Sequence, residues 1–312
     1  MSIFGIFVRS RQERKHMLSM DKYGIGNTPM IELPAFRDNR ILIKLESKNF
    51  LGSVKARSGY FMVKNLPLAS EGKVIVESTS GNLGFALGFF CNETGRKFLA
   101  LIDPTVAESK RRRMEKAGIA YRMVGKENGY DYRSSRILTA QRLAEGGEFY
   151  WVNQYDNPSN VEAHQMTTAF EIWEGTYGSV THVVCAMGSC GTICGVGAYL
   201  HQRNPRITIV GVEPYGSTIF GTEKADYLNA GAGLVGKPGN LLRHADSVDE
   251  AYTVSDTDSI RAAKELRRDF HISAGITTGM AFYQAMKLAS RLRKACIVVI
   301  SPDGGESYDA YL

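Results

Sequence analysis

Short apolar segments alternate with helix-like segments along most of the 312 residues of this chain. Buried strands are predicted at residues 73–78, 98–103, 120–124, 182–187, 207–213 and 296–300. Helices are predicted at residues 83–91, 106–116, 133–143, 162–177, 192–202, 259–269 and 279–292. Apolar strands that alternate with helices are typical of parallel sheets covered on both faces. Because the pattern forms two series, before and after residue 160, it predicts an α/β protein with two parallel-sheet lobes and a cleft between them.

Two segments rich in glycine lie between a predicted strand and a predicted helix, where backbone N–H groups can hold an anion. The first is residues 78–84 (Ser-Thr-Ser-Gly-Asn-Leu-Gly), whose short hydroxyl side chains suit a carboxylate. The second is residues 188–192 (Gly-Ser-Cys-Gly-Thr), whose glycines allow the backbone to approach a phosphate closely. The second segment lacks the glycine spacing of a dinucleotide site and the Gly-Lys-Ser/Thr of a Walker loop. For either segment alone, a capped helix or a plain turn is the alternative.

A third segment, residues 52–57 (Gly-Ser-Val-Lys-Ala-Arg), places Lys55 at the start of a predicted helix. In this order and spacing, the three segments resemble those of the cysteine synthase family of pyridoxal-phosphate (PLP) enzymes, also called fold type II. The resemblance extends from about residue 24 to residue 310. It implies a tryptophan synthase β-like α/β fold with PLP between two lobes, and a homodimer. The lobes implied are a smaller one of residues 46–158 and a larger one of residues 1–45 and 159–312.

The resemblance also implies roles for individual residues. Lys55 would hold PLP as an imine and, once freed by a substrate amine, act as a base over the substrate Cα. The implied cofactor-binding residues are Lys55, Asn82, Gly188, Ser189, Cys190, Gly191, Thr192, Thr278 and Gly304. The implied substrate-binding residues, chiefly for the α-carboxylate, are Thr79, Ser80, Gly81, Asn82, Leu83 and Gln154.

Three positions depart from the family pattern. Ala56 stands where the family usually has Asp, and we expect this to affect lobe packing rather than the bond to PLP. Leu83 replaces a common Thr, which removes a hydroxyl but leaves the backbone N–H. Gly304 replaces a serine that touches the PLP pyridine nitrogen, so Thr278, Asp303 or water would have to take over that contact.

The activity implied is β-replacement on an O-activated L-serine, with O-acetylserine or O-phosphoserine as the first substrate. A sulfur or amine nucleophile would then give L-cysteine or a β-substituted alanine. Residues 78–84, 129–136 and 216–221 resemble a branch that joins O-phosphoserine and glutamate on the way to 2,3-diaminopropionate. Arg133 and Arg136 follow a predicted strand and could face the cleft to bind a phosphate leaving group, although exposed helix arginines are the alternative.

Two other functions remain open at this point. A serine or threonine dehydratase shares the lysine and the phosphate loop, but it usually has Ser-Phe-Lys and a run of four glycines, which this chain lacks. A binding protein of the same fold without activity is the second alternative, against which Lys55, Asn82 and the phosphate loop argue.

Composition argues against several other classes. The net charge is +6, but the basic residues are scattered, and the cluster at residues 110–113 has no interleaved aromatics, which predicts solvated helix faces rather than nucleic-acid binding. The longest apolar runs fall short of the roughly 18–20 residues of a membrane span, and residues 1–15 lack the charge order of a signal peptide. Five cysteines, mostly in apolar segments, indicate a reduced cytoplasmic protein. Cys190 and Cys194 have no second pair at zinc spacing, so no metal is expected.

Overall fold

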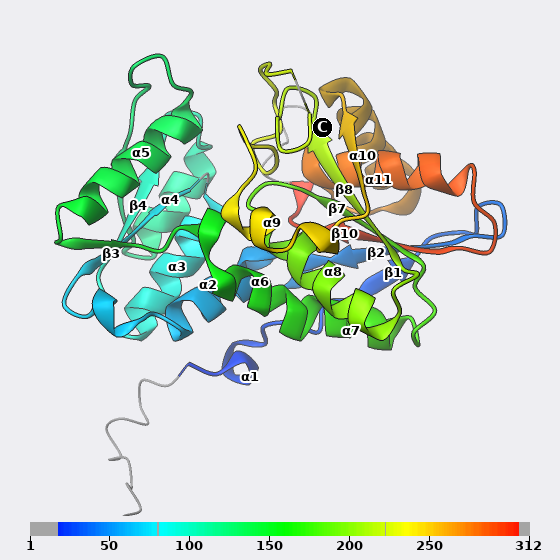
Figure 1. Cartoon of the computed structure of the whole chain (residues 1–312), viewed down its shortest axis with the longest axis horizontal. Coiled ribbons are helices and arrows are strands. Elements are labelled where there is room, and N and C mark those ends of the chain that lie inside the picture. Colours follow the sequence, from blue (N-terminus) through cyan, green and yellow to red (C-terminus); the bar gives the residue numbers. More distant parts are fainter. Residues whose placement is uncertain (1–17, 80, 222, 306–312) are drawn as a thin grey trace, which may run out of the picture.

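The computed structural model describes residues 18–79, 81–221 and 223–305, which form two sheets that lie side by side (Figure 1). The larger sheet has the strand order β1-β2-β10-β7-β8-β9, and the smaller has the order β5-β4-β3-β6. Neighbouring strands are parallel except β1 and β2, which are antiparallel. The predicted α/β architecture with two parallel-sheet lobes is confirmed.

The strands are β1 (Met30–Glu32), β2 (Arg40–Leu45), β3 (Val74–Ser78), β4 (Phe98–Ile102), β5 (Ala120–Met123), β6 (Phe149–Trp151), β7 (His182–Ala186), β8 (Thr208–Pro214), β9 (Glu250–Val254) and β10 (Cys296–Ser301). The α-helices are α1 (Met20–Tyr23), α2 (Lys55–Lys64), α3 (Asn82–Glu93), α4 (Glu108–Lys116), α5 (Tyr132–Glu145), α6 (Pro158–Ala163), α7 (Ala169–Gly175), α8 (Gly191–Arg203), α9 (Gly239–Arg243), α10 (Asp256–Phe270) and α11 (Ile276–Ala289). A 3-10 turn, Gln154–Asp156, follows β6.

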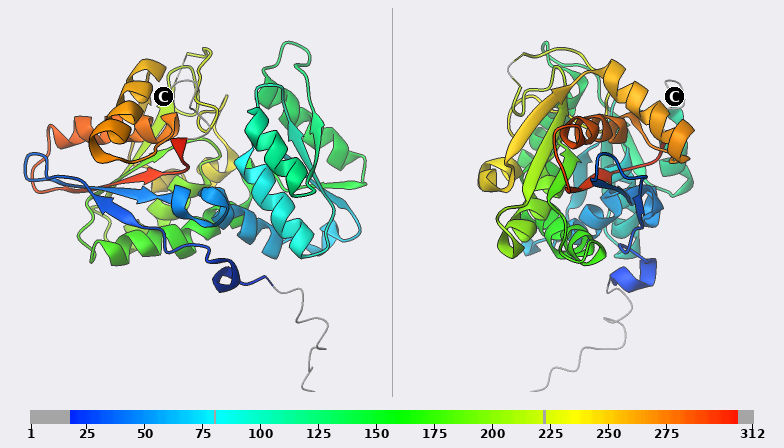
Figure 2. Two further views of the ribbon diagram at one scale, coloured as in Figure 1. Left: turned by 180° about the vertical axis from the view of Figure 1, so that it is seen from behind. Right: turned by 90° about the vertical axis from the view of Figure 1, so that its right-hand side faces the viewer.

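Both faces of each sheet are covered by helices, which explains why the central strands are mostly apolar. In β10, Ile297 and Val299 pack with α10 and α11, whereas Val298 and Ile300 pack with α7 and α8. Figure 2 shows these helix pairs on opposite sides of the larger sheet. The smaller sheet is covered by α2, α3 and α4 on one face and by α5 on the other. The alternation of side chains therefore buries nearly every position of the central strands, whereas the edge strands β1, β5 and β9 have exposed positions.

The six predicted strands are all present, and the stretch predicted to be helical at residues 162–177 is helical, although it begins at residue 158, ends at residue 175 and contains a π-helical turn. That stretch consists of α6, a π-helical turn (His164–Thr168) and α7. Within the turn, His164 is buried and its Nδ1 lies 2.9 Å from Thr168 Oγ1. A π turn inserts one extra residue into a helix, and such turns are frequent near functional sites. Apolar periodicity does not reveal this insertion, because the flanking turns keep the helical pattern.

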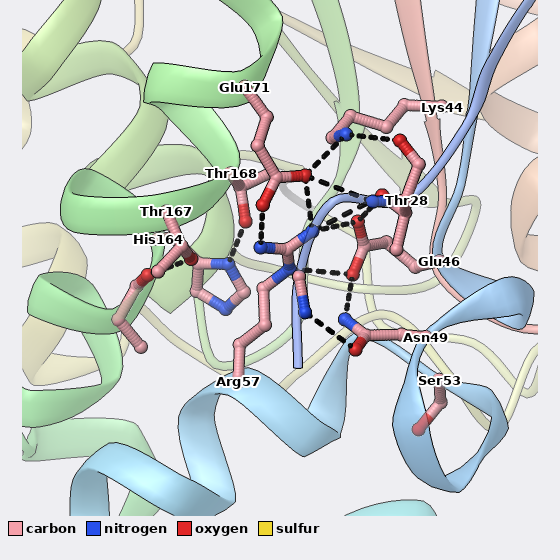
Figure 3. A network of polar contacts seen from close by, with 12 residues as sticks. Thr28, Lys44, Glu46, Asn49, Ser53, Arg57, His164, Thr167, Thr168 and Glu171 are labelled. Carbon is pink, nitrogen blue, oxygen red and sulfur yellow. Dashed lines mark hydrogen bonds and ion pairs between the residues drawn. The ribbon is translucent and has the colours of Figure 1, made fainter. Parts of the chain in front are cut away.

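A buried ion network holds the helix that carries Lys55 (Figure 3). Arg57, in the first turn of α2, has no exposed side-chain surface and donates from Nε and Nη2 to Glu46, at 2.8 Å each. On its other side, Arg57 Nη1 lies 2.5 Å from Glu171 Oε1, and Nη2 donates to Glu171 Oε2 at 2.8 Å. Lys44 of β2 also bonds to Glu171, at 2.7 Å. The network therefore joins β2, α2 and α7.

The charges in this network compensate one another although they are buried. Burial alone would raise the pKa of Glu171, but Arg57 and Lys44 lower it to about 2. Glu46 is fully buried, and its pKa is also lowered, because the effects of Arg57 and Lys44 outweigh the effect of burial. Thr28 and Asn49 donate further hydrogen bonds to Glu46, at 2.7 and 2.8 Å. Both carboxylates are therefore ionised and depend on the two cations.

We expect Arg57→Met to lower the free energy of unfolding by about 3–5 kcal/mol, because it leaves two buried carboxylates with Lys44 as their remaining cation. The matched control is Arg40→Met, which breaks an exposed pair with Glu32 and should cost about 0–1 kcal/mol. Urea-induced unfolding of both variants measures the difference. Equal losses would contradict a structural role for the network.

Candidate active site

A cleft lies between the two sheets at the carboxyl ends of their parallel strands. Residues that follow β3, β6, β7 and β10 line it, namely Thr79, Gln154, Gly188 and Pro302. Parallel α/β sheets bind ligands at this edge, because the strand ends and the helix N-termini that follow them converge there. Two sheets that present this edge to one cavity form a site with contributions from both lobes.

Lys55 is the first residue of α2 and lines the cleft. The segment before it is tied to the end of β10: Val54 N donates to Pro302 O at 2.8 Å, and Ser53 forms an isolated bridge with Asp303. Burial lowers the pKa of Lys55, and the nearby Cys185 and Asp303 offset part of this effect. A lowered pKa raises the neutral fraction of the amine, which is the form that attacks a carbonyl group.

The loop between β3 and α3 has the geometry of an anion site at a helix N-terminus. Thr79 Oγ1 accepts hydrogen bonds from Gly81 N (3.0 Å) and Gly84 N (2.9 Å), which fixes the first turn of α3. Gly81 has a φ of 131°, which side chains other than glycine rarely adopt. Asn82 and Leu83 line the cleft beside Thr79.

Gln154 lines the cleft from the 3-10 turn that follows β6, and its side chain is oriented by β3. Its Nε2 donates to Ser78 O at 2.9 Å, and its backbone N donates to Glu77 Oε2 at 3.1 Å. Glu77 is fully buried, and burial raises the pKa of its carboxyl group to about 8. The side chain of Gln154 thus has a fixed direction next to the loop that follows Thr79.

Residues 188–192 form a turn that leads directly into the N-terminus of α8. Cys190 has a φ of 59°, and Gly191 begins the helix. A Cβ on Gly191 would lie 2.2 Å from Asn160 Cγ, so this position requires glycine. Four residues of the turn line the cleft: Gly188, Ser189, Cys190 and Thr192. A turn of this kind at the N-terminus of a 13-residue helix is suited to hold a phosphate.

His164 supports the turn, and sequence reasoning did not identify it. Its Nε2 lies 3.2 Å from Thr192 Oγ1, while its Nδ1 faces Thr168. Burial lowers the pKa of His164 to about 3, so the imidazole is neutral at physiological pH. No motif spacing marks this histidine, because its partners come from a different part of the chain.

Three further basic side chains line the cleft. Lys110 belongs to the cluster predicted to be a solvated helix face, but its aliphatic carbons pack beside Gly81 and its pKa is lowered by burial. Arg136 Nε lies 2.9 Å from Asp103 Oδ2 as an ion pair. The Nη1 of Arg136 is buried and has no hydrogen-bond partner among the described residues. Arg136 thus brings an unsatisfied donor to the cleft.

Arg133 also reaches the cleft, but its donors are occupied. Nη1 donates to Gly233 O and, at 3.2 Å, to the hydroxyl group of Tyr227. Nη2 donates to the backbone oxygens of Ala230 and Ala232, at 3.4 and 3.3 Å. Arg133 therefore connects α5, which covers the smaller sheet, to the loop at residues 230–233. This loop is bonded in turn to the end of β7, because Gly233 N donates to Met187 O.

Several other predicted positions lie elsewhere. Ser80 lies outside the described residues. Gly81, Gly191, Gly304 and Thr278 are not among the residues that line the cleft. Thr278 is buried behind it, with its Oγ1 2.9 Å from Ser301 Oγ, while its neighbour Thr277 lines the cleft. Asp303 also lines the cleft and accepts from Asn82 Nδ2 at 2.9 Å.

The described residues fit PLP. One cavity holds a lysine with a lowered pKa, a glycine turn at a helix N-terminus for a phosphate, and a second such terminus for a carboxylate. No group of three His, Cys, Asp or Glu side chains in the described ranges could hold a metal ion. No described helix is long and apolar enough to cross a membrane.

Comparison with known proteins gives one family. Residues 22–303 match the family described as pyridoxal-phosphate dependent enzyme. Cysteine synthase B of Salmonella typhimurium is 34% identical over 293 residues, with 91% of this chain and 92% of that protein covered. O-acetylserine dependent cystathionine beta-synthase from Helicobacter pylori is 28% identical in structural alignment, with a TM-score of 0.84 and coverage of 94% of this chain and 97% of that chain. O-ureido-L-serine synthase is 30% identical with a TM-score of 0.81, and 91% of each chain is covered.

These matches extend over nearly the whole chain, and they confirm the predicted fold type II architecture and the dependence on PLP. The chain belongs to the cysteine synthase family of pyridoxal-phosphate dependent enzymes.

Proposed function

We propose that the protein catalyses β-replacement on O-phospho-L-serine, with phosphate as the leaving group. The observation that supports phosphate as the leaving group is the buried Nη1 of Arg136, a residue that lines the cleft, because this donor has no hydrogen-bond partner in the part of the chain that the structure describes. The ion pair with Asp103 uses the Nε side of the guanidinium, and a buried donor that stays unsatisfied on the other side is costly unless a ligand accepts from it. A phosphate oxygen supplies a charged acceptor, whereas an acetyl ester offers only a neutral carbonyl oxygen, which makes a weaker hydrogen bond.

In this proposal the chain's own groups divide the work. Gln154 and the loop from Thr79 to Leu83 hold the substrate α-carboxylate, and the turn at residues 188–192 holds the cofactor phosphate. PLP, when bound, supplies an electron sink for a carbanion at Cα. Lys55 Nζ removes the Cα proton, the bond between Cβ and the phosphate oxygen breaks, and Arg136 stabilises the departing phosphate. A nucleophile then adds to Cβ, and Lys55 returns a proton to Cα.

The nucleophile is proposed to be anionic, such as glutamate, because the cleft contains more basic than acidic side chains. Cysteine formation from O-acetylserine and sulfide is the second candidate, and the cysteine synthase relatives favour it. The two candidates are separated by assaying each serine ester, O-acetylserine or O-phosphoserine, with each nucleophile and identifying the product. The nucleophiles are sulfide, thiosulfate, cyanide and glutamate. Release of pyruvate and ammonia without any added nucleophile would instead indicate a dehydratase.

The proposal also includes a homodimer in the cytoplasm. Each subunit has a smaller lobe of residues 46–158 and a larger lobe of residues 1–45 and 159–312. The five cysteines are buried and free, which fits a reducing compartment. Sedimentation of the purified protein tests the dimer.

Lys55 is expected to be the PLP attachment site, because its amine lies in the cleft with a lowered pKa. Borohydride reduction of the purified yellow protein should fix the cofactor to the peptide that contains residue 55. Lys110 is the matched control, since it is the other lysine that lines the cleft within the described residues and its pKa is also lowered by burial. Label on the Lys110 peptide, detected by mass spectrometry, would refute the assignment.

Arg136→Gln is expected to reduce kcat/KM for O-phosphoserine roughly 10- to 100-fold, the loss of one charge-assisted hydrogen bond. Activity with O-acetylserine should change little. Arg133→Gln is the matched control, because its guanidinium donors already bind backbone oxygens, and it should affect both substrates alike. The proposal fails if wild-type protein prefers O-acetylserine, or if only the Arg133 variant loses the preference.

Gln154→Ala should lower kcat/KM for both serine esters equally, roughly 10- to 100-fold, because both carry the same α-carboxylate. The content of PLP should not change, since the substitution leaves the backbone of the turn intact. Steady-state kinetics and cofactor absorbance measure the two quantities. A variant that loses PLP, or one with unchanged kinetics, contradicts the role proposed for Gln154.

A further inference from the structure

Two buried asparagines connect the parts of the cleft that are proposed to hold the substrate and the cofactor. Asn160 Nδ2 donates to Gln154 O at 2.8 Å and to Ser189 Oγ at 3.0 Å. Asn240 Nδ2 donates to the same Gln154 oxygen at 2.8 Å and to Ser189 O at 2.9 Å. Asn160 is 2% exposed and Asn240 is not exposed at all. Each amide therefore joins the turn after β6 to the turn before α8.

The surrounding backbone leaves little room for these amides to move. Asn160 lies against Gly191. A Cβ added to Gly191 would be 2.2 Å from Asn160 Cγ. Asn240 Oδ1 accepts from Asn157 N at 3.0 Å, which connects α9 to the start of α6. Asn157 in turn caps α6 by accepting from Ser159 N at 2.9 Å. The positions of both amides are thus set by backbone contacts on several sides.

An amide is the side chain that these contacts require. Each Nδ2 group has two hydrogens and donates them to two acceptors on different turns: both amides share Gln154 O, and each bonds one oxygen of Ser189, Oγ for Asn160 and the backbone oxygen for Asn240. A carboxylate at position 240 would face two carbonyl oxygens without a hydrogen to donate. Removing the amide would leave buried acceptors with fewer partners, which is costly in a dry interior.

We infer that Asn160 and Asn240 are positioning residues that hold Gln154 and the phosphate turn as one unit, so that cofactor phosphate and substrate carboxylate bind cooperatively. The inference rests on the proposed roles of Gln154 and of residues 188–192. A phosphate that orders Ser189 also orders the backbone oxygen of Gln154, and a carboxylate held by Gln154 stabilises the phosphate turn in return. Such coupling is reciprocal by thermodynamic necessity.

The test is a double-mutant cycle with a matched control. Asn39 provides the control, because it is fully buried, makes the same kind of contacts and lies at the amino end of β2, whereas the cleft is at the carboxyl ends of the strands. Its Nδ2 donates to the backbone oxygens of Ala289 (2.9 Å) and Leu292 (3.1 Å), and its Oδ1 accepts from Ala295 N (2.9 Å). Asn240→Ala and Asn39→Ala therefore remove equivalent hydrogen bonds, but only the first removes them at the cleft.

In the Asn240→Ala background, Gln154→Ala should cost much less in kcat/KM than it does in the wild-type background, because Gln154 is already displaced. In the Asn39→Ala background its cost should be unchanged. The holoenzyme with Asn240→Ala should also release PLP roughly tenfold faster during dialysis, whereas Asn39→Ala should not alter release. If Asn240→Ala does not fold, Asn160→Ala replaces it in both measurements.

Two outcomes overturn the inference: an unchanged cost of Gln154→Ala in the Asn240→Ala background, or equal PLP release from the Asn240 and Asn39 variants. The proposed function fails separately. If Gln154→Ala alone has no effect on the wild type, the carboxylate role of Gln154 is wrong, and the PLP release of the Asn240 variant still decides whether the bridge holds the phosphate turn.

Discussion

The buried pairing of Arg57 with Glu46 and Glu171 is the constraint on which the position of Lys55 depends. Arg57 lies two residues after Lys55 in the first turn of α2, and its guanidinium is held from two sides by carboxylates on other elements. Since a helix is rigid over one turn, fixing Arg57 fixes the direction in which Lys55 enters the cleft. Lys44 of β2 joins the same network, so the larger sheet holds α2 through charge as well as through packing. A network of fully paired buried charges is specific in geometry, because any shift leaves a charge without its partner.

The cleft is assembled from strand ends that cannot adjust independently of one another. The turn after β6, the turn before α8 and the N-terminus of α6 meet at Asn160 and Asn240, and the close approach at Gly191 leaves no room for a side chain there. His164 supports the same turn from the π-helical insertion through Thr192. These contacts are short and buried, and they connect the turn after β6 to the turn before α8 more directly than the sheets do. Packing of the sheets places the cleft, while hydrogen bonds between the turns set its inner dimensions.

Much of this arrangement could be predicted from sequence, and the failures have physical causes. Strands β3, β4, β7, β8 and β10 were predicted because both of their faces are buried, which makes them apolar throughout. Strand β2 escaped prediction because Arg40 and Lys44 interrupt its apolar run, and the buried partner that neutralises Lys44 is 127 residues away in the chain. Asn160, Asn240 and His164 lie in no recognisable motif, since their partners are brought to them by the fold. Arg133 and Arg136 looked equivalent in sequence, yet one binds backbone oxygens while the other has a donor left over.

The charge of the cleft follows from these placements and limits which substrate suits it. Among the described residues, Lys55, Lys110, Arg133 and Arg136 line it, against the single carboxylate of Asp303. Arg133 is satisfied by backbone oxygens, Asp303 accepts from Asn82, and the ion pair of Arg136 with Asp103 leaves its Nη1 without a partner among the described residues. Burial lowers the pKa of both Lys110 and Arg136, which shows that their charged forms are poorly solvated without a ligand. Cations that are already desolvated and oriented stabilise a transition state in which negative charge develops. The stabilisation is greatest for a substrate whose leaving group becomes more negative as the Cβ–O bond breaks. Phosphate meets that condition with two charges and acetate with one, so under the proposed function these side chains would favour the phosphate ester over the acetyl ester during the reaction.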